Sequence, residues 1–279
     1  MLLRFISIST CVAAAFGMVN GASAAVHISD TFTAANNTAL IGRAPAPINV
    51  PGSVYAGNGN VSTLGGITGG TPYQADIQGN LARVGADAGL ALNLGISTPT
   101  EFQLTITFNI SGDTQTQADD IHRGAALGFF SSVALGSSGS SHGFNNFTGL
   151  VVDRAGSVRL IISGADSGVA TTVPGFDPNV DHTLSYIVNT TVGSGIAYSI
   201  QLDSTSVSLS APVNTFTLAR TVMAGFYNSS GNAADVASFD NFNVSIVPEP
   251  SSCALLGSAA LLMGFLRWRR NRNAGISDR

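Results

Sequence analysis

The side chains that could perform catalysis are few in this sequence, and their spacing does not favour an enzyme. Nucleophilic catalysis needs a serine or cysteine beside a histidine and an acid. The nearest acid–histidine cluster is Asp119-Asp120-Ile121-His122, which is typical of a solvent-exposed loop. The four histidines show no metal-binding spacing such as His-x-x-x-His. The glycine-rich stretches at 57–59 and 65–70 lack the strand-then-helix context of a phosphate-binding loop. The sequence therefore predicts a body that is not an enzyme.

Charge and cysteine usage exclude further classes of function. Every basic residue is an arginine, and residues 26–250 contain six arginines against fifteen carboxylates, a formal charge of −9. Nucleic-acid binding needs a basic surface, so no nucleic-acid partner is expected. An acidic body is compatible with cation binding. The two cysteines, Cys11 and Cys253, lie in the terminal segments, which excludes disulfides and cysteine metal sites from the body.

Alternating and short apolar stretches predict an all-β body, an antiparallel β-sandwich of the jelly-roll type. Residues 102–110 alternate between apolar and polar side chains, as a strand with one wet face does. Two hairpins are predicted, 182–189 with 196–203 and 149–153 with 157–162. Short apolar runs at 125–130 and 222–227 are typical of central strands, and 237–247 is predicted to be the last strand. Residues 34–75 are predicted to form a loop-rich segment with short edge strands.

Residues 1–25 have the order of a secretory signal peptide. The positive charge of Arg4 precedes an apolar run to Val19, and small residues follow through Ala25. We therefore expect an N-terminal signal helix, export by the Sec machinery, and a single body domain over residues 26–246. Cleavage is expected after Ala24 or Ala25.

The C-terminal segment predicts a membrane anchor. The apolar run 251–268 would be about 27 Å long as a helix at about 1.5 Å per residue, which is marginal against a hydrocarbon core of about 30 Å. It predicts a single transmembrane helix. The basic cluster consists of Arg267, Arg269, Arg270 and Arg272. By the positive-inside rule this cluster leaves residues 273–279 in the cytoplasm and the body outside it.

Residues 247–272 resemble the PEP-CTERM sorting tail of Gram-negative bacteria. Val247, Pro248, Glu249 and Pro250 stand where that family has its sorting motif, and the apolar helix and arginine cluster follow in the family's order. The resemblance implies recognition by an exosortase and transient anchoring in the inner membrane. Processing near the motif would then move the body to the cell surface or to an exopolysaccharide matrix. An ordinary C-terminal anchor is the alternative.

Two short stretches of the body resemble concanavalin/laminin-G-like jelly rolls, one from Asp30 to Pro45 and one from Phe239 to Val244. The resemblance implies that the first and last strands are neighbours. Asp30 and Asp240 are then candidate ligands for calcium, which prefers carboxylate and carbonyl oxygens. No other cofactor is expected. The resemblance also suggests a glycoside hydrolase, and such enzymes of this fold typically carry a Glu-x-Asp-x-x-Glu strand. Glu101 has no acidic partner within the next ten residues, so a glycoside hydrolase is not expected.

Further loop acids offer alternatives for a cation site, although none matches a calcium-loop pattern: Asp113, Asp119 and Asp120 in one stretch, Asp177 and Asp181 in another. Two functions remain open for the body. One is a non-catalytic structural or adhesive surface protein. The other is a lectin-like carbohydrate-binding module, either with or without calcium.

Sugar binding needs an aromatic platform with amide or carboxylate groups. The body has tyrosines, and Asn145 and Asn146 beside a Ser/Gly loop, but its chain has one tryptophan, which lies in the tail at Trp268. The resemblance of residues 247–272 to the PEP-CTERM tail implies an exopolysaccharide matrix, which is the partner that either function would meet.

Overall fold

The computed structural model describes residues 25–57, 75–86, 88–96, 101–112, 124–132, 146–190, 195–210, 212–229 and 235–247. Residues Val26–Ile246 form one compact unit. Its described parts consist of strands, turns and one 3-10 helix, η2 (Leu218–Arg220). Within these ranges, no helix has the length and apolar character needed to span a membrane. The predicted signal helix and transmembrane helix fall outside the described residues and stay predictions.

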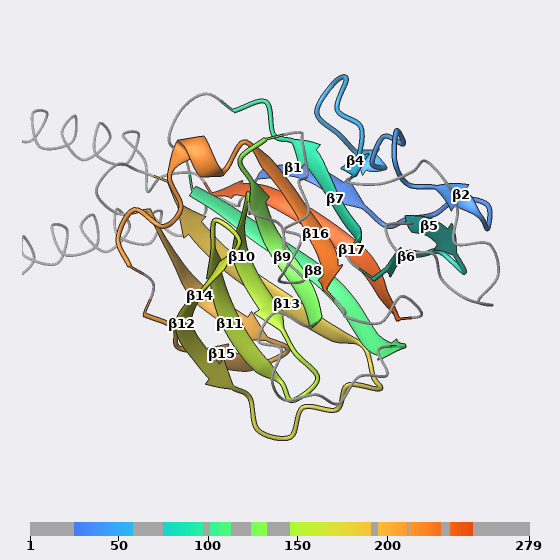
Figure 1. Ribbon diagram of the computed structural model, residues 1–279. Coiled ribbons are helices and arrows are strands. Elements are labelled where there is room, and N and C mark those ends of the chain that lie inside the picture. The colour runs from blue at the N-terminus through green and yellow to red at the C-terminus, as the bar shows by residue number, and fades with distance from the viewer. Residues whose placement is uncertain are drawn as a thin grey trace, which may run out of the picture. The chain divides into compact units, whose positions relative to one another are not determined.

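Sheet A is the larger of two sheets (Figure 1). Its hydrogen-bonded order is β15 (Thr205–Val207), β14 (Ile196–Leu202), β13 (His182–Asn189), β8 (Glu101–Gly112), β17 (Val236–Val247), β6 (Leu81–Gly85), β5 (Ala75–Gln78) and β2 (Thr38–Ala39). The first strand, β1 (Ala25–Asp30), also pairs with β17, and β3 (Pro47–Ile48) pairs with β1. The expected pairing of the first and last strands is therefore confirmed.

Sheet B lies in front of sheet A in Figure 1. Its order is β12 (Ala165–Thr172), β11 (Ser157–Ile162), β10 (Phe147–Val152), β9 (Gly124–Phe130), β16 (Met223–Ser229), β7 (Ala88–Asn93) and β4 (Ala56–Gly57). The pairings with an assigned register are antiparallel in both sheets. This confirms an all-β antiparallel fold.

Alternation along β8 determines which side of sheet A faces the core. Phe102, Leu104 and Ile106 are buried, whereas the intervening polar side chains are half-buried. Strand β13 has the same alternation and pairs with β8 over its whole length. The two predicted hairpins, β13–β14 and β10–β11, are both present. The β10–β11 turn uses Gly156 at φ +74°, a conformation that glycine adopts without steric strain.

The two sheets pack face to face through one hydrophobic core. Phe102 of β8 contacts Phe129 of β9 with ring centroids 5.9 Å apart, and Phe226 of β16 contacts Phe239 of β17 at 4.8 Å. The buried Tyr186 hydroxyl on β13 donates to the Leu127 carbonyl on β9, 2.7 Å away. Side chains from both sheets therefore share one interior, which is the arrangement of a β-sandwich.

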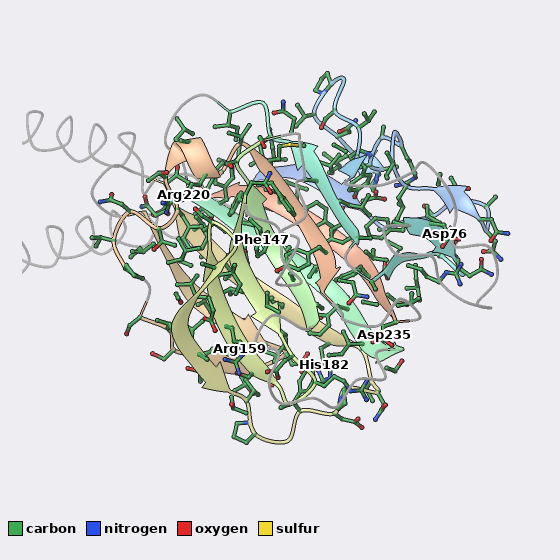
Figure 2. All side chains as sticks on the ribbon, viewed as in Figure 1. Asp76, Phe147, Arg159, His182, Arg220 and Asp235 are labelled. Atoms are coloured by element: carbon green, nitrogen blue, oxygen red, sulfur yellow. The ribbon has the colours of Figure 1, made fainter. Side chains whose placement is uncertain are left out.

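A second apolar cluster lies on the outer face of sheet B. Its members are Ala91, Ala126, Phe130, Phe147, Val151, Ile161, Met223 and Tyr227, all buried. Phe147, labelled on the near sheet in Figure 2, contacts Tyr227 edge-to-face with centroids 4.7 Å apart. Its ring occupies the space beside Gly128 and Gly149, where an added Cβ would lie 2.8 and 2.6 Å from ring atoms. Both faces of sheet B are thus apolar over this region.

Candidate functional site

The outer face of sheet A carries side chains of one chemical kind. Where the inner face is apolar, the outer positions of β8, β13, β14 and β17 hold mostly hydroxyl and amide groups, half-buried or exposed. We call this surface the hydroxyl–amide face. Its members are Gln103, Thr105, Thr107, Asn109, Thr183, Ser185, Asn189, Ser199, Gln201, Ser238, Asn243 and Ser245.

Cross-strand contacts connect the side chains of β8 with those of β13 and of Asp181 before it. Thr183 lies opposite Thr107, and their hydroxyl oxygens are 3.4 Å apart. The Asn189 amide donates to Glu101 over 2.7 Å at one end of the β8–β13 pair. At the other end the Asn109 amide donates to Asp181 over 2.9 Å. The Thr107 and Thr183 hydroxyls and the Asn109 side-chain amide each have more than one donor or acceptor position.

Two carboxylates stand at one end of the hydroxyl–amide face. Asp181 directly precedes β13 and is exposed, and Asp240 lies on β17, on the outer side between the buried Phe239 and Phe242. Partial burial raises the pKa of Asp240, and the negative charges of Asp181 and Asp30 act in the same direction, against the hydrogen bond from the Asn241 backbone. The two aspartates therefore repel each other across the face.

The described arginines are engaged elsewhere. Arg43 and Arg83 pair with Asp30 and Asp76, and Arg159 lies near Asp153 and Asp166 on sheet B. The remaining two, Arg154 and Arg220, donate to backbone carbonyls. Figure 2 shows Asp76 on β5, and Arg159 and Arg220 at separate places in the sandwich. Among the described residues, no arginine forms an ion pair with Asp181 or Asp240.

Asp30 has a structural role that differs from the predicted one. It is fully buried, and its carboxylate accepts two hydrogen bonds from the Arg43 guanidinium, one from the Tyr55 hydroxyl at 3.0 Å and one from the Phe32 backbone at 2.9 Å. Burial, followed by the Asp30 charge, raises the pKa of Tyr55 well above its usual value. The Tyr55 phenol therefore remains a donor at neutral pH.

The calcium site predicted for Asp30 and Asp240 is not supported by this geometry. The structure brings the two close enough for Asp30 to act on Asp240, but both oxygens of Asp30 already bind protein donors. No group of three or more histidine, cysteine, aspartate or glutamate side chains in the described part of the chain is placed to hold a metal ion. Of the alternative acids, the stretch with Asp113, Asp119 and Asp120 lies outside the described residues.

His182 joins three segments at the lower end of the view in Figure 2. Its Nδ1 lies 2.8 Å from Asp203, its Nε2 lies 2.6 Å from the Asp177 carbonyl, and its ring stacks on Phe176 with centroids 4.0 Å apart. Hydrogen bonds from the backbone and side chain of Asn179 lower the pKa of Asp177. The sequence did not indicate this cluster, since its members come from different loops. The contacts of His182 connect the loop before β13 to the β14–β15 turn.

The aromatic platform expected for sugar binding is not found on a described surface. Tyr55, Tyr186 and Tyr227 are all buried. Asn146 donates to Ser132, as a turn residue does. Of the sorting motif, Val247 ends β17, while Pro248, Glu249 and Pro250 lie outside the described residues, as does the basic cluster of Arg267, Arg269, Arg270 and Arg272.

Comparison with known proteins gives structural likenesses only. No family model and no curated protein matches the chain. The carbohydrate recognition domain of Emp47p is similar at 14% identity and a TM-score of 0.45, over 76% of this chain and 94% of that one. Peanut lectin is similar at 11% identity and a TM-score of 0.44, over 70% and 97%. The alginate lyase Aly36B is similar at 14% identity and a TM-score of 0.38, over 70% and 97%.

The prediction that the body is not an enzyme is corrected by this comparison. Structures similar to the chain include an alginate lyase beside the carbohydrate-recognition proteins. The sequence also contains Gly139-Ser140-Ser141-His142-Gly143, which has the Gly-x-Ser-x-Gly spacing of a nucleophile elbow. An elbow requires a strand-to-helix turn, and these residues lie outside the described ranges.

Proposed function

We propose that this chain is an exported protein whose sandwich binds a polysaccharide outside the cytoplasm, through the hydroxyl–amide face. The observation that supports the proposal is the composition of that face: outward positions on four adjacent strands hold hydroxyls and amides, half-buried or exposed. Hydroxyl and amide groups both donate and accept hydrogen bonds, which matches a sugar polymer whose surface is covered with hydroxyls.

The spacing of a sheet also suits a polymer. Neighbouring strands lie about 4.7–4.9 Å apart, and alternate side chains repeat about every 6.6–6.8 Å along a strand. A repeating ligand can therefore meet many equivalent groups. Each hydrogen bond exchanged with water contributes little, about 0.5–1.5 kcal/mol, so affinity requires many contacts with an extended chain.

The terminal segments support the exported location. The signal peptide predicted for residues 1–25 and the PEP-CTERM-like tail at 247–272 both predict a body outside the cytoplasm. In this proposal the Sec machinery exports the chain, the tail holds it at the inner membrane, and an exosortase processes it near Pro248–Pro250. The body then reaches the cell surface or the exopolysaccharide matrix.

Binding is tested with the full-length chain, purified in detergent and passed over immobilised exopolysaccharide from the producing organism. Ser185→Arg places a long side chain at the centre of the face, where Ser185 lies opposite Thr105 and Gln201. Ala170→Arg adds the same residue at an exposed position on β12 of sheet B. We expect retention of the wild type and of Ala170→Arg, and its loss in Ser185→Arg.

Equal retention of the two variants would show that the hydroxyl–amide face is not the binding surface. No retention of the wild type on any polysaccharide would refute the proposed function. The eluted polymer is also sized by gel filtration, because shortened chains would reveal that cleavage accompanies binding.

The sorting tail is tested by replacing Pro248, Glu249 and Pro250 together with alanine in the producing cell. We expect the full-length chain to accumulate in the inner-membrane fraction while the wild type is shortened, as measured by intact-protein mass. Identical masses and locations of the wild type and the variant would contradict exosortase processing.

A further inference from the structure

Resting on the proposed function, we propose that the polysaccharide bound by the hydroxyl–amide face is built of amino sugars with free, protonated amines, and that Asp181 and Asp240 receive these amines. Charge complementarity at one end of the face supports this choice of partner. Asp181 is exposed and Asp240 is half-buried on the outer side of β17. Neither has an arginine partner among the described residues.

The two carboxylates retain acceptor capacity for a ligand. Asp181 accepts a hydrogen bond from the Asn109 amide. Asp240 accepts two, from the backbone and the side-chain amide of Asn241. An ionised carboxylate offers about four acceptor positions. An ammonium group has three donors and no acceptor, whereas a neutral sugar hydroxyl has only one donor. An ammonium group therefore complements the carboxylate oxygens better than a hydroxyl does.

Repulsion between the carboxylates favours a cation over a neutral ligand. Asp181 and Asp30 both act on Asp240 to disfavour its ionised form. A positive charge placed beside Asp181 and Asp240 lowers this repulsion, and the hydroxyl groups of Thr107, Thr183 and Ser238 nearby on the same face remain available to the rest of the sugar.

The same charges disfavour a polyanion. Residues 26–250 have a formal charge of −9, and the arginines of the described residues bond within the sandwich rather than on this face. A uronate polymer would therefore bring carboxylates against carboxylates. Of the hydroxyl-rich polymers, one with protonated amines is the best match to this surface.

The experiment measures binding of the full-length chain, in detergent, to three soluble probes of equal length: a β-1,4-linked glucosamine oligosaccharide, its fully N-acetylated form, and an alginate oligosaccharide. The buffer is mildly acidic and low in salt, so that the amines are protonated. Variants are Asp181→Asn, Asp240→Asn and their combination. The matched control is Asp166→Asn, which removes the same charge from β12 of sheet B.

We expect the glucosamine probe to bind more tightly than its acetylated form and alginate not to bind. Each substitution on the face should weaken binding by up to about fivefold, as expected for a half-exposed ion pair of up to about 1 kcal/mol. Added salt should reduce the difference between the probes. Asp166→Asn should bind as the wild type does.

Equal affinity for the amine and acetylated probes would overturn the amine assignment and leave the proposed polysaccharide binding in place. So would an equal loss in Asp166→Asn, because the effect would then follow net charge and not the face. Failure of all three probes, and of native exopolysaccharide, would refute the proposed function itself. Thermal unfolding of each variant confirms that it is folded.

Discussion

Replacing Asp30 by asparagine should destabilise the sandwich strongly, because the substitution removes the charge at the centre of a buried network. The Asp30 carboxylate accepts hydrogen bonds from Arg43, Tyr55 and the Phe32 backbone. Asparagine has nearly the same shape and can still accept from Phe32. Its amide, however, points donor hydrogens at a guanidinium or a phenol, and it leaves the Arg43 charge without its partner.

The magnitude follows from the burial of the pair. Breaking a buried ion pair by removing one partner costs about 3–5 kcal/mol. Asp30 is 0% exposed, but the Arg43 side chain is 14% exposed and can be partly solvated after the substitution. We therefore expect a loss of about 3 kcal/mol, measured as the change in unfolding free energy from urea titration followed by circular dichroism.

Asp166→Asn provides the matched control, since its partner Arg159 is 3.8 Å away and 24% exposed. Its loss should stay below about 1 kcal/mol. A loss of less than about 1 kcal/mol in Asp30→Asn would refute the reasoning, because a buried pair of this kind cannot be so weak. Stabilisation of the wild type by calcium, absent in Asp30→Asn, would instead restore the metal-ligand interpretation.

Three further predictions concern packing, the sheet interface and charge. Gly225→Ala should lower the unfolding free energy by about 1–3 kcal/mol or prevent folding, since the added Cβ would lie 2.0 Å from the Leu90 carbonyl oxygen. If this variant were as stable in urea as the wild type, the result would contradict the register of β16 and β7. Tyr186→Phe should cost about 1 kcal/mol by removing the hydrogen bond to Leu127, and no loss in the same titration would argue against this bond between the sheets. Because the pKa of Asp240 is raised by folding, its stabilising contribution is fully present only below the ordinary carboxyl pKa and is lost as pH rises. Asp240→Asn should thus not lower stability at neutral pH, gaining at most a few tenths of a kcal/mol because the group is half-exposed, whereas a clear loss at neutral pH would show that the ionised form is favoured.

Strands with regular alternation could be predicted from the sequence, and strands with internal charges could not. The alternation of 102–110 predicts β8 and its inner face because burial of one side is a local property of the pattern. The hairpin β5–β6 carries Asp76 opposite Arg83, which resembles a loop in sequence. These charges lie within a sheet because each neutralises the other through two hydrogen bonds, at 3.0 and 2.8 Å.

Glycine and asparagine residues in turns and irregularities made other strands difficult to predict from the sequence. Gly79 and Asn80 both have positive φ, at 61° and 62°, which suits a two-residue hairpin turn between β5 and β6. Strand β12 contains Gly168 at φ +74°, whose N–H bonds to Asp166. This irregularity interrupts the alternation by which β12 could have been recognised.

The candidate site depends on contacts between distant residues, which one sequence does not reveal. The expected proximity of Asp30 and Asp240 came from a family resemblance, and the structure agrees with it. The partners that occupy Asp30, at positions 43 and 55, are determined by chain folding and leave no local pattern. From the sequence, the hydroxyl–amide face can be predicted only as the polar side of β8. Its continuation across β13, β14 and β17 follows from the strand order, which the sequence pattern does not give.

The position of β17 determines how the sandwich would bear tension. This strand ends at Val247, directly before the segment predicted to be a sorting tail, and it lies between β8 on one side and β6 and β1 on the other. A pull on the tail, from flow past an anchored cell for example, therefore enters an interior strand of 12 residues. Extraction along the strand direction loads hydrogen bonds on both edges together instead of opening them one at a time. A body attached through this segment would thus be held by a strand that is hydrogen-bonded on both edges.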